Sequence, residues 1–451
     1  MSNLFSSRRF RLATGSLAIA GTAMVLASCS SGGGSEAGAS AGGSLGTAED
    51  PVTVTVMYGS SDFTEDMIAE FESENPNIDI NFIEYDATRL NAMLTAGDAP
   101  DLVRGGPNAN LFAKGQATPL DDYIANSDVV TADDLVSAND AWRFDGTTRG
   151  EGEYYGLLKD WSPDTTIWQN EALFEGTGVD PLDLTEPASW DEVLEKAKAL
   201  KEAGVKYPLG IEWQWGLSNL LMTMVLQQGG AVYSEDMATV DLETPEAERA
   251  LQWLIDYGQS GVGITTGNPL PDGQDAPTFV AGEMAMTMDG YWFGGNLQSD
   301  EAAAVAETAS MAPAPTFGER ISPIFGGVGA YIPATAKNKD AAWEVLEYFV
   351  SSTPAEQRAA TGWGLPALES LWDLLPSEQP FQEQAKEAAL AETDYVQPLP
   401  DSIYMTNNQW DQVVDAELMK GIDGGASVED VAKSIEDQIN TLLAQGKDQL
   451  G

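Results

Sequence analysis

The chain has 451 residues, with 22 Lys and Arg against 71 Asp and Glu, and its net charge of −49 at pH 7 disfavours nucleic acid and anionic lipid as partners. It contains no histidine, which excludes histidine-dependent triads, HExxH zinc sites and imidazole proton shuttles. Neither a G-x-x-x-x-G-K-[ST] loop nor a G-x-G-x-x-G turn after a strand is present, so we expect no bound nucleotide. We also expect no other cofactor and no metal.

The N-terminus has the pattern of an export signal. Arg8, Arg9 and Arg11 precede an uncharged run over 12–28, and small residues close it. A retained membrane helix is the alternative, but the run falls short of the ~20 apolar residues that a spanning helix needs. We predict a cleaved signal over residues 1–28. The paired arginines suit either the Sec or the twin-arginine route, and both remain open.

Leu26-Ala27-Ser28-Cys29 resembles the lipobox of bacterial lipoproteins. The resemblance implies that Cys29, the only cysteine, becomes an acylated N-terminus outside the cell. Ser, Gly and Ala then dominate up to Asp50, with Leu45 as a lone large apolar residue, so residues 29–50 are expected to be a disordered tether that spans roughly 25 Å r.m.s..

The remaining ~400 residues are enough for two lobes. Val52, Val54 and Val56 alternate as a strand, Ser61 or Asp62 is expected to cap a helix that ends at Asn75-Pro76, and alternation resumes at Ile78. This β-α-β opening predicts parallel pairing. A helix over 88–96, ending at Gly97, and a strand over 101–103 continue the α/β pattern.

Further helices are predicted from caps and apolar stripes. Ser189, Thr244-Pro245 and Ser427 are the expected starts of three of them. Trp142, Trp190, Trp253 and Trp343 lie on apolar stripes or at helix starts, which is typical of core residues.

Ordered motifs over 51–451 resemble the family 1 extracellular solute-binding proteins of ABC importers. They include Leu94-Thr95-Ala96-Gly97-Asp98-Ala99-Pro100-Asp101-Leu102, Tyr155-Gly156-Leu157-Leu158, Ser189-Trp190-Asp191-Glu192 and, most specifically, Phe279-Val280-Ala281-Gly282-Glu283-Met284-Ala285-Met286 with Gly290-Tyr291-Trp292. Leu158 and Gln169 depart from the family's usual proline and tyrosine.

The resemblance implies an α/β, two-lobe, periplasmic-binding-protein-like fold of type II, each lobe a mainly parallel sheet flanked by helices, with a ligand cleft between lobes. We predict one lobe from 51–158 plus 328–361 and the other from 159–327 plus 362–451. The expected crossings lie near residues 157–159, 326–331 and 361–364.

Candidate ligand residues combine aromatic rings with polar groups, as a sugar site requires. Trp292 matches the family's sugar-stacking tryptophan. Trp213 and Trp215 are spaced to share one side of a strand. For these two residues, and for Trp161 and Trp363, a role in ligand binding and a place in the core are about equally supported. The other candidates are Asp62, Asn108, Asp160, Tyr404 and Trp410; Asp62 and Asn108 are also suited to capping.

The resulting hypothesis is a non-enzymatic, lipid-anchored, monomeric receptor on the outer face of the cell membrane, which captures a mono- or oligosaccharide for an ABC permease with a separate ATPase. A binding protein for a polyol or polyamine is the first alternative. An anchored carbohydrate-active enzyme that uses two carboxylates is the second, and an adhesin is the third.

Overall fold

The computed structural model describes residues 45–211, 213, 216–270, 274–325 and 327–450. The predicted signal over 1–28, the lipidation site Cys29 and the candidate Trp215 lie outside the described residues. In the described part of the chain, no helix combines the length and hydropathy required to cross a membrane.

The first lobe is built on a five-stranded sheet in the order β2-β1-β3-β13-β6. Its strands are β1 (Val52–Tyr58), β2 (Ile78–Glu84), β3 (Leu102–Gly105), β6 (Leu157–Leu158) and β13 (Gly329–Tyr331). Its helices are α1 (Glu65–Glu74), α2 (Ala87–Ala96), α3 (Ala109–Ala113), α4 (Asp121–Asn126), α10 (Lys339–Ser351) and α11 (Thr353–Thr361).

The second lobe contains a four-stranded sheet in the order β11-β8-β10-β9. Its strands are β8 (Ile167–Asn170), β9 (Tyr207–Gly210), β10 (Met284–Met288) and β11 (Ala309–Ala312). Its helices are α5 (Trp190–Glu202), α6 (Leu217–Leu226), α7 (Pro245–Ser260), α8 (Asp275–Val280), α9 (Ala303–Ala306), α12 (Pro380–Glu392), α13 (Asn407–Ile422) and α14 (Val428–Leu450).

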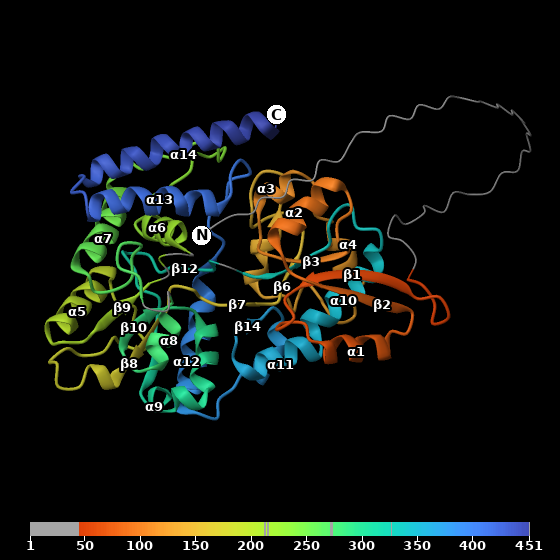
Figure 1. Cartoon of the computed structure of the whole chain (residues 1–451), viewed down its shortest axis with the longest axis horizontal. Coiled ribbons are helices and arrows are strands. Elements are labelled where there is room, and N and C mark those ends of the chain that lie inside the picture. The colour runs from red at the N-terminus through yellow and green to blue at the C-terminus, as the bar shows by residue number, and fades with distance from the viewer. Residues whose placement is uncertain (1–44, 212, 214–215, 271–273, 326, 451) are drawn as a thin grey trace, which may run out of the picture. The chain divides into compact units, whose positions relative to one another are not determined.

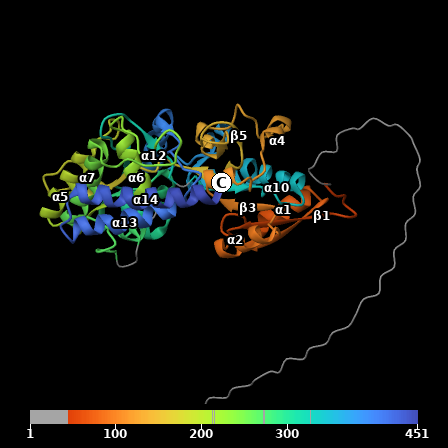
Figure 2. The same ribbon diagram turned by 90° about the horizontal axis from the view of Figure 1, so that it is seen from above.

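Figures 1 and 2 show the two sets of elements as separate groups, with β7 (Asp160–Trp161) and β14 (Leu365–Pro366) between them in Figure 1. These short strands pair with each other in antiparallel register. A second small pair, β12 (Ser322–Pro323) with β15 (Val396–Gln397), is parallel. A third, β4 (Arg143–Phe144) with β5 (Glu153–Tyr154), is antiparallel.

The predicted two-lobe α/β fold is confirmed, but the sheets are mixed rather than mainly parallel. β1 is parallel to β2 and β3, as the β-α-β opening predicts, whereas β13 is antiparallel to β3 and β6. In the second sheet only β9 and β10 are parallel. Strands β6, β8 and β13 lie next to the crossing segments and are not part of β-α-β units. No crossover helix therefore imposes parallel pairing on them.

Local signals account for several helix boundaries. Ser189 and Thr244 cap α5 and α7 as predicted, and Gly97 ends α2 in the left-handed conformation. The cap of α1 differs from the prediction, because the Thr64 hydroxyl accepts from the Met67 N–H at 3.4 Å. Asp62 is thereby free for other contacts.

The core predictions are confirmed for Trp142, Trp190, Trp253 and Trp343, which are all buried. The tether prediction is wrong for its described end, residues 45–50, while residues 29–44 lie outside the described residues. Asn77 donates its side-chain N–H to the Leu45 carbonyl at 2.8 Å, and Thr47 and Asp50 form a bridge. These hydrogen bonds attach residues 45–50 to the folded unit.

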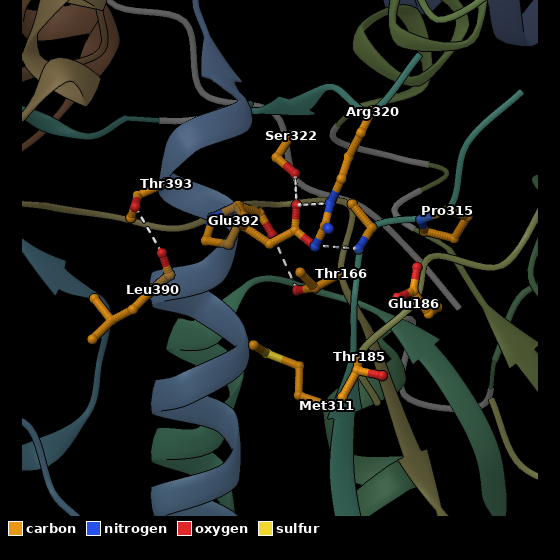
Figure 3. Close-up of polar contacts among 12 residues, drawn as sticks. Thr166, Thr185, Glu186, Met311, Pro315, Arg320, Ser322, Leu390, Glu392 and Thr393 are labelled. Atoms are coloured by element: carbon orange, nitrogen blue, oxygen red, sulfur yellow. Dashed lines mark hydrogen bonds and ion pairs between the residues drawn. The ribbon is translucent and has the colours of Figure 1, made fainter. Parts of the chain in front are cut away.

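A buried carboxylate holds the β12 segment against the end of α12 (Figure 3). Glu392 is fully buried and accepts from the Arg320 guanidinium at 2.6 Å, the Ala314 N–H at 3.1 Å and the Ser322 hydroxyl. These contacts are made inside the protein. Loss of the Glu392 carboxylate would therefore leave the largely buried Arg320 guanidinium without its partner.

We therefore expect Glu392→Ala to lower the free energy of unfolding by about 3 kcal/mol, measured by urea denaturation. Glu387→Ala is the matched control, because Glu387 is exposed on the same helix. Equal midpoints for the two variants would contradict the structural role of Glu392.

Candidate functional site

The crossing segments border an open cavity of about 410 Å³, here called the crossover cavity. It is lined by Arg104, Lys159, Asp160, Trp161, Ser162, Asp164, Trp292, Phe325, Gly327, Val328 and Trp363. Arg104 lies in β3 of the first lobe, and Trp292 lies in the 3-10 helix η3 (Tyr291–Gln298) of the second. Both lobes therefore contribute walls to this cavity.

Two indoles form its aromatic wall. Trp292 and Trp363 are nearly parallel, with ring centroids 6.4 Å apart and planes at 14°. Trp363 is 44% exposed, whereas Trp292 is half-buried and its backbone N–H donates to the Ser162 hydroxyl at 3.0 Å. Trp161 is only 3% exposed, and its indole N–H donates to the Pro366 carbonyl at 3.3 Å. Trp292 and Trp363 are the indoles available to a ligand.

A row of alternating charges has three of its members, Arg104, Lys159 and Asp160, at the same cavity. Asp62 contacts Lys159 at 2.7 Å, Lys159 contacts Asp160 at 3.2 Å, and Asp160 contacts Arg358 at 3.4 Å. Arg104 lies 4.0 Å from Asp62 at the other end. Partly buried ammonium, guanidinium and carboxylate groups offer both donors and acceptors to a polar solute.

A second cavity of about 520 Å³, here called the α11 cavity, adjoins the first. It is lined by Ser61, Asp62, Thr64, Met67, Lys159, Pro354, Gln357, Arg358, Thr361 and Trp363. Lys159 and Trp363 line both cavities. The two cavities are thus neighbours on either side of these side chains.

A third cavity, of about 560 Å³, belongs to the second lobe. Trp213, Thr266, Asn407, Asn408, Asp411, Gln412 and Asp415 line it. The Trp213 indole donates to Asp415 at 2.7 Å and stacks on Tyr257. Burial raises the pKa of Asp411, whose carboxylate accepts from the Ser218 N–H at 2.9 Å. Trp213 lies after β9 has ended at Gly210, so the strand expected to carry it does not extend that far.

The structure brings five of the candidates together at the first two cavities: Asp62, Asp160, Trp161, Trp292 and Trp363. Trp213 lines the third cavity.

The remaining described candidates line none of the three cavities. Trp410 is fully buried and donates to the Tyr233 hydroxyl at 2.5 Å. The Lys447 ammonium lies 5.6 Å from the ring centroid of Tyr404. Asn108 caps α3, accepting from the Leu111 N–H at 3.1 Å.

Sequence reasoning missed Arg104, Arg358 and Gln357, together with the polar residues of α13 at the third cavity. The scarcity of basic residues is a signal that could have pointed to the two arginines. With 22 Lys and Arg against 71 Asp and Glu, each basic residue near a crossing segment is a candidate for a specific role. No spacing in the sequence marks Gln357. In the described part of the chain, no group of three or more His, Cys, Asp and Glu is arranged to hold a metal ion.

The segment between β15 and α13 makes a separate contact with the first lobe. Asp401 is buried 3.6 Å from Arg149 and accepts from the Ala109 N–H at 2.9 Å. Burial raises the pKa of Asp401 although Arg149 opposes the shift. Arg149 also donates to the Leu399 carbonyl at 2.6 Å.

A two-lobe α/β fold with polar and aromatic cavities at its crossings is the architecture of proteins that bind a solute between lobes. The sequence profile of the bacterial extracellular solute-binding protein family matches residues 59–356. The chain belongs to this family, whose members are extracellular binding proteins. A search of curated proteins gives no match.

Solved structures show the same fold. An ABC substrate-binding protein from Listeria monocytogenes, solved with cycloalternan, has a TM-score of 0.72 at 23% identity and covers 88% of this chain and 100% of its own. The GacH receptor of Streptomyces glaucescens, solved unliganded and with acarbose, has a TM-score of 0.67 at 21% identity, with coverages of 87% and 98%. The sugar-binding protein MalE from Xanthomonas citri has a TM-score of 0.68 at 18% identity, with coverages of 88% and 98%.

The buried Arg149–Asp401 pair generates a pH-dependent prediction. We expect Arg149→Met to lower the free energy of unfolding by about 3 kcal/mol at pH 7, because it leaves a buried carboxylate without its cation. The loss should be smaller at pH 4.5. Burial places the pKa of folded Asp401 above its usual value, so the folded state binds a proton that the unfolded state lacks, and stability falls as pH rises through that window.

Urea denaturation of variant and wild type at both pH values isolates this effect, since the protonation of other carboxylates is common to both proteins. Arg143→Met is the control, because Arg143 is more exposed and pairs with a partly exposed Asp140. A loss for Arg149→Met that is identical at both pH values would rule out Asp401 as its cause.

Proposed function

We propose that this protein captures a sugar at the crossover cavity and delivers it to a membrane permease driven by a separate ATPase. The observation that carries the proposal is the placement of Trp292 and Trp363 beside the charge row from Asp62 to Arg358. A sugar ring presents apolar C–H faces and a rim of hydroxyls. Indole faces suit the former, and paired charges with hydroxyl side chains suit the latter.

Ligands of structural relatives favour a sugar over a polyol or polyamine. The relatives from L. monocytogenes and S. glaucescens were solved with cycloalternan and acarbose, respectively. The family is one of binding proteins, so we propose capture and release of intact sugar without catalysis.

Hinge motion of the lobes about the crossings is the proposed response to ligand. We propose that the boundaries between the lobes lie near residues 158/159 and 327/328, as the sequence predicts. For the third crossing, contacts of the segment after β14 favour a boundary nearer residue 375 than 361. Leu368 belongs to the first-lobe core, the Val136 N–H donates to the Ala367 carbonyl at 3.0 Å, and the Glu369 N–H donates to the Asp134 carbonyl at 2.9 Å.

Acylation at Cys29 is the proposed means of attachment, with the residues after it as a tether and the monomer as the working state. We expect Cys29→Ser to move the protein from the membrane fraction to the medium, as read by immunoblotting of both fractions. Ser28→Ala serves as a control that keeps the cysteine. A Cys29→Ser protein that stays in the membrane fraction would instead favour a retained N-terminal helix.

For binding itself, a thermal-shift screen of sugars, polyols and polyamines followed by calorimetry tests the assignment. A specific ligand at 100 times its Kd adds about 2.7 kcal/mol of stability. We expect Trp292→Ala to weaken sugar binding at least about tenfold, because burial of the ring contributes about 2 kcal/mol and 1.4 kcal/mol corresponds to a factor of ten.

Tyr395→Ala is the control for that experiment, since Tyr395 is an exposed aromatic residue that lines none of the three cavities. Stabilisation by polyamines alone would contradict the sugar assignment. Cleavage of a bound glycan by purified protein, abolished by one carboxylate substitution, would establish the enzyme alternative.

A further inference from the structure

Among the described residues, Lys159 and Trp363 are the two that line both the crossover and the α11 cavity. The cavity volumes of about 410 and 520 Å³ each fall in the range of roughly 300–1,000 Å³ that is usual for small-molecule sites. The space beside α11 is therefore large enough to hold part of a ligand by itself, and the Trp363 indole is the main aromatic boundary between it and the crossover cavity.

The backbone around Trp363 holds the indole in this position. Gly362 and Gly364 flank it with φ of 68° and 127°, in the region that favours glycine. A Cβ at Gly364 would lie 2.9 Å from the Asp160 side chain, and a Cβ at Gly295 would lie 2.7 Å from the Trp363 ring. Glycine at these positions lets the indole rest on η3 beside the charge row.

The lining of the α11 cavity has the same chemistry as the crossover cavity. Ser61, Thr64 and Thr361 bring hydroxyls and Gln357 brings an amide, while Met67 and Pro354 supply apolar surface. Asp62, Lys159 and Arg358 continue the charge row into it. Hydroxyl, amide and ionic groups beside an indole face are suited to a second sugar unit.

We infer that the α11 cavity is a second subsite of the same ligand site, and that Trp363 is the wall shared by both subsites. The ligand class is then an oligosaccharide of at least two units, one in the crossover cavity and the next beside α11. This inference rests on the proposed function. It adds that affinity depends on chain length, and that residues on the exposed face of α11 set this dependence.

Blocking the α11 cavity tests the inference. Gln357 is exposed on α11 and lines this cavity but not the crossover cavity, so Gln357→Trp fills the second subsite while Gln357→Ala leaves it open. Calorimetry would compare both variants and the wild type with glucose, galactose, xylose and the malto-, galacto- and xylo-oligosaccharides of two to five units.

For the wild type, we expect affinity to rise at least tenfold between one unit and the longer members of the preferred series. Gln357→Ala loses one amide contact but leaves the space open, so its rise should be smaller and still present. For Gln357→Trp this rise should disappear, while affinity for the single unit changes less than twofold. Thr361→Trp, which blocks the same cavity from another exposed position, should reproduce the result if the first variant folds poorly.

The outcomes separate the two proposals. If the wild type binds sugars and Gln357→Trp retains the full dependence on length, the second subsite is ruled out and the proposed function stands. If the wild type prefers single units, the inference is overturned in the same way. If the wild type binds none of these sugars but binds a polyol or polyamine, both the proposed function and the inference fail.

Discussion

Lys159 joins two of the crossing segments to the first-lobe loop after β1 and to α11, the helix that precedes the third crossing. Its ammonium contacts Asp62, which follows β1, and Asp160 in the first crossing, at 2.7 and 3.2 Å. Its backbone N–H donates to the Val328 carbonyl in the second crossing at 3.0 Å, and its carbonyl accepts from Arg358 of α11 at 3.2 Å. Crossing segments have few ladder hydrogen bonds of their own, so this side chain and its carboxylates set their relative positions. The candidate site is built on that arrangement.

Two sets of charges in this protein differ in their exposure to solvent. Glu392 and Asp401 are buried with their guanidinium partners and serve packing between segments. The row from Asp62 to Arg358 borders two cavities and remains accessible to a solute. A net charge of −49 keeps the molecule soluble, while some of its 22 basic residues are used inside these cavities. The positions of Arg104, Lys159 and Arg358 at the two cavities therefore indicate a candidate site, which the overall excess of carboxylates does not.

Local signals in the sequence predicted much of the fold. Caps at Ser189 and Thr244, the glycine end of α2 and the parallel pairing of β1 with β2 follow from short stretches of chain. The antiparallel pairings of β8 and β13 were not predictable in this way, because they depend on where a strand enters its sheet after crossing between lobes. The cap of α1 shows a second limit. Four polar residues, Ser60, Ser61, Asp62 and Thr64, precede that helix, and Thr64 caps it while Asp62 contacts Lys159.

The sequence by itself determined the α/β class and the family and made Trp292 a candidate, because each is encoded in periodicity or in ordered motifs. Tertiary structure alone decided which tryptophans reach solvent. Trp161, Trp363 and Trp410 have equally suggestive positions in the chain, yet Trp410 is fully buried, Trp161 is only 3% exposed at the crossover cavity, and Trp363 is 44% exposed between two cavities. Burial is a property of segments that meet from distant parts of the chain, and no local pattern of residues records it.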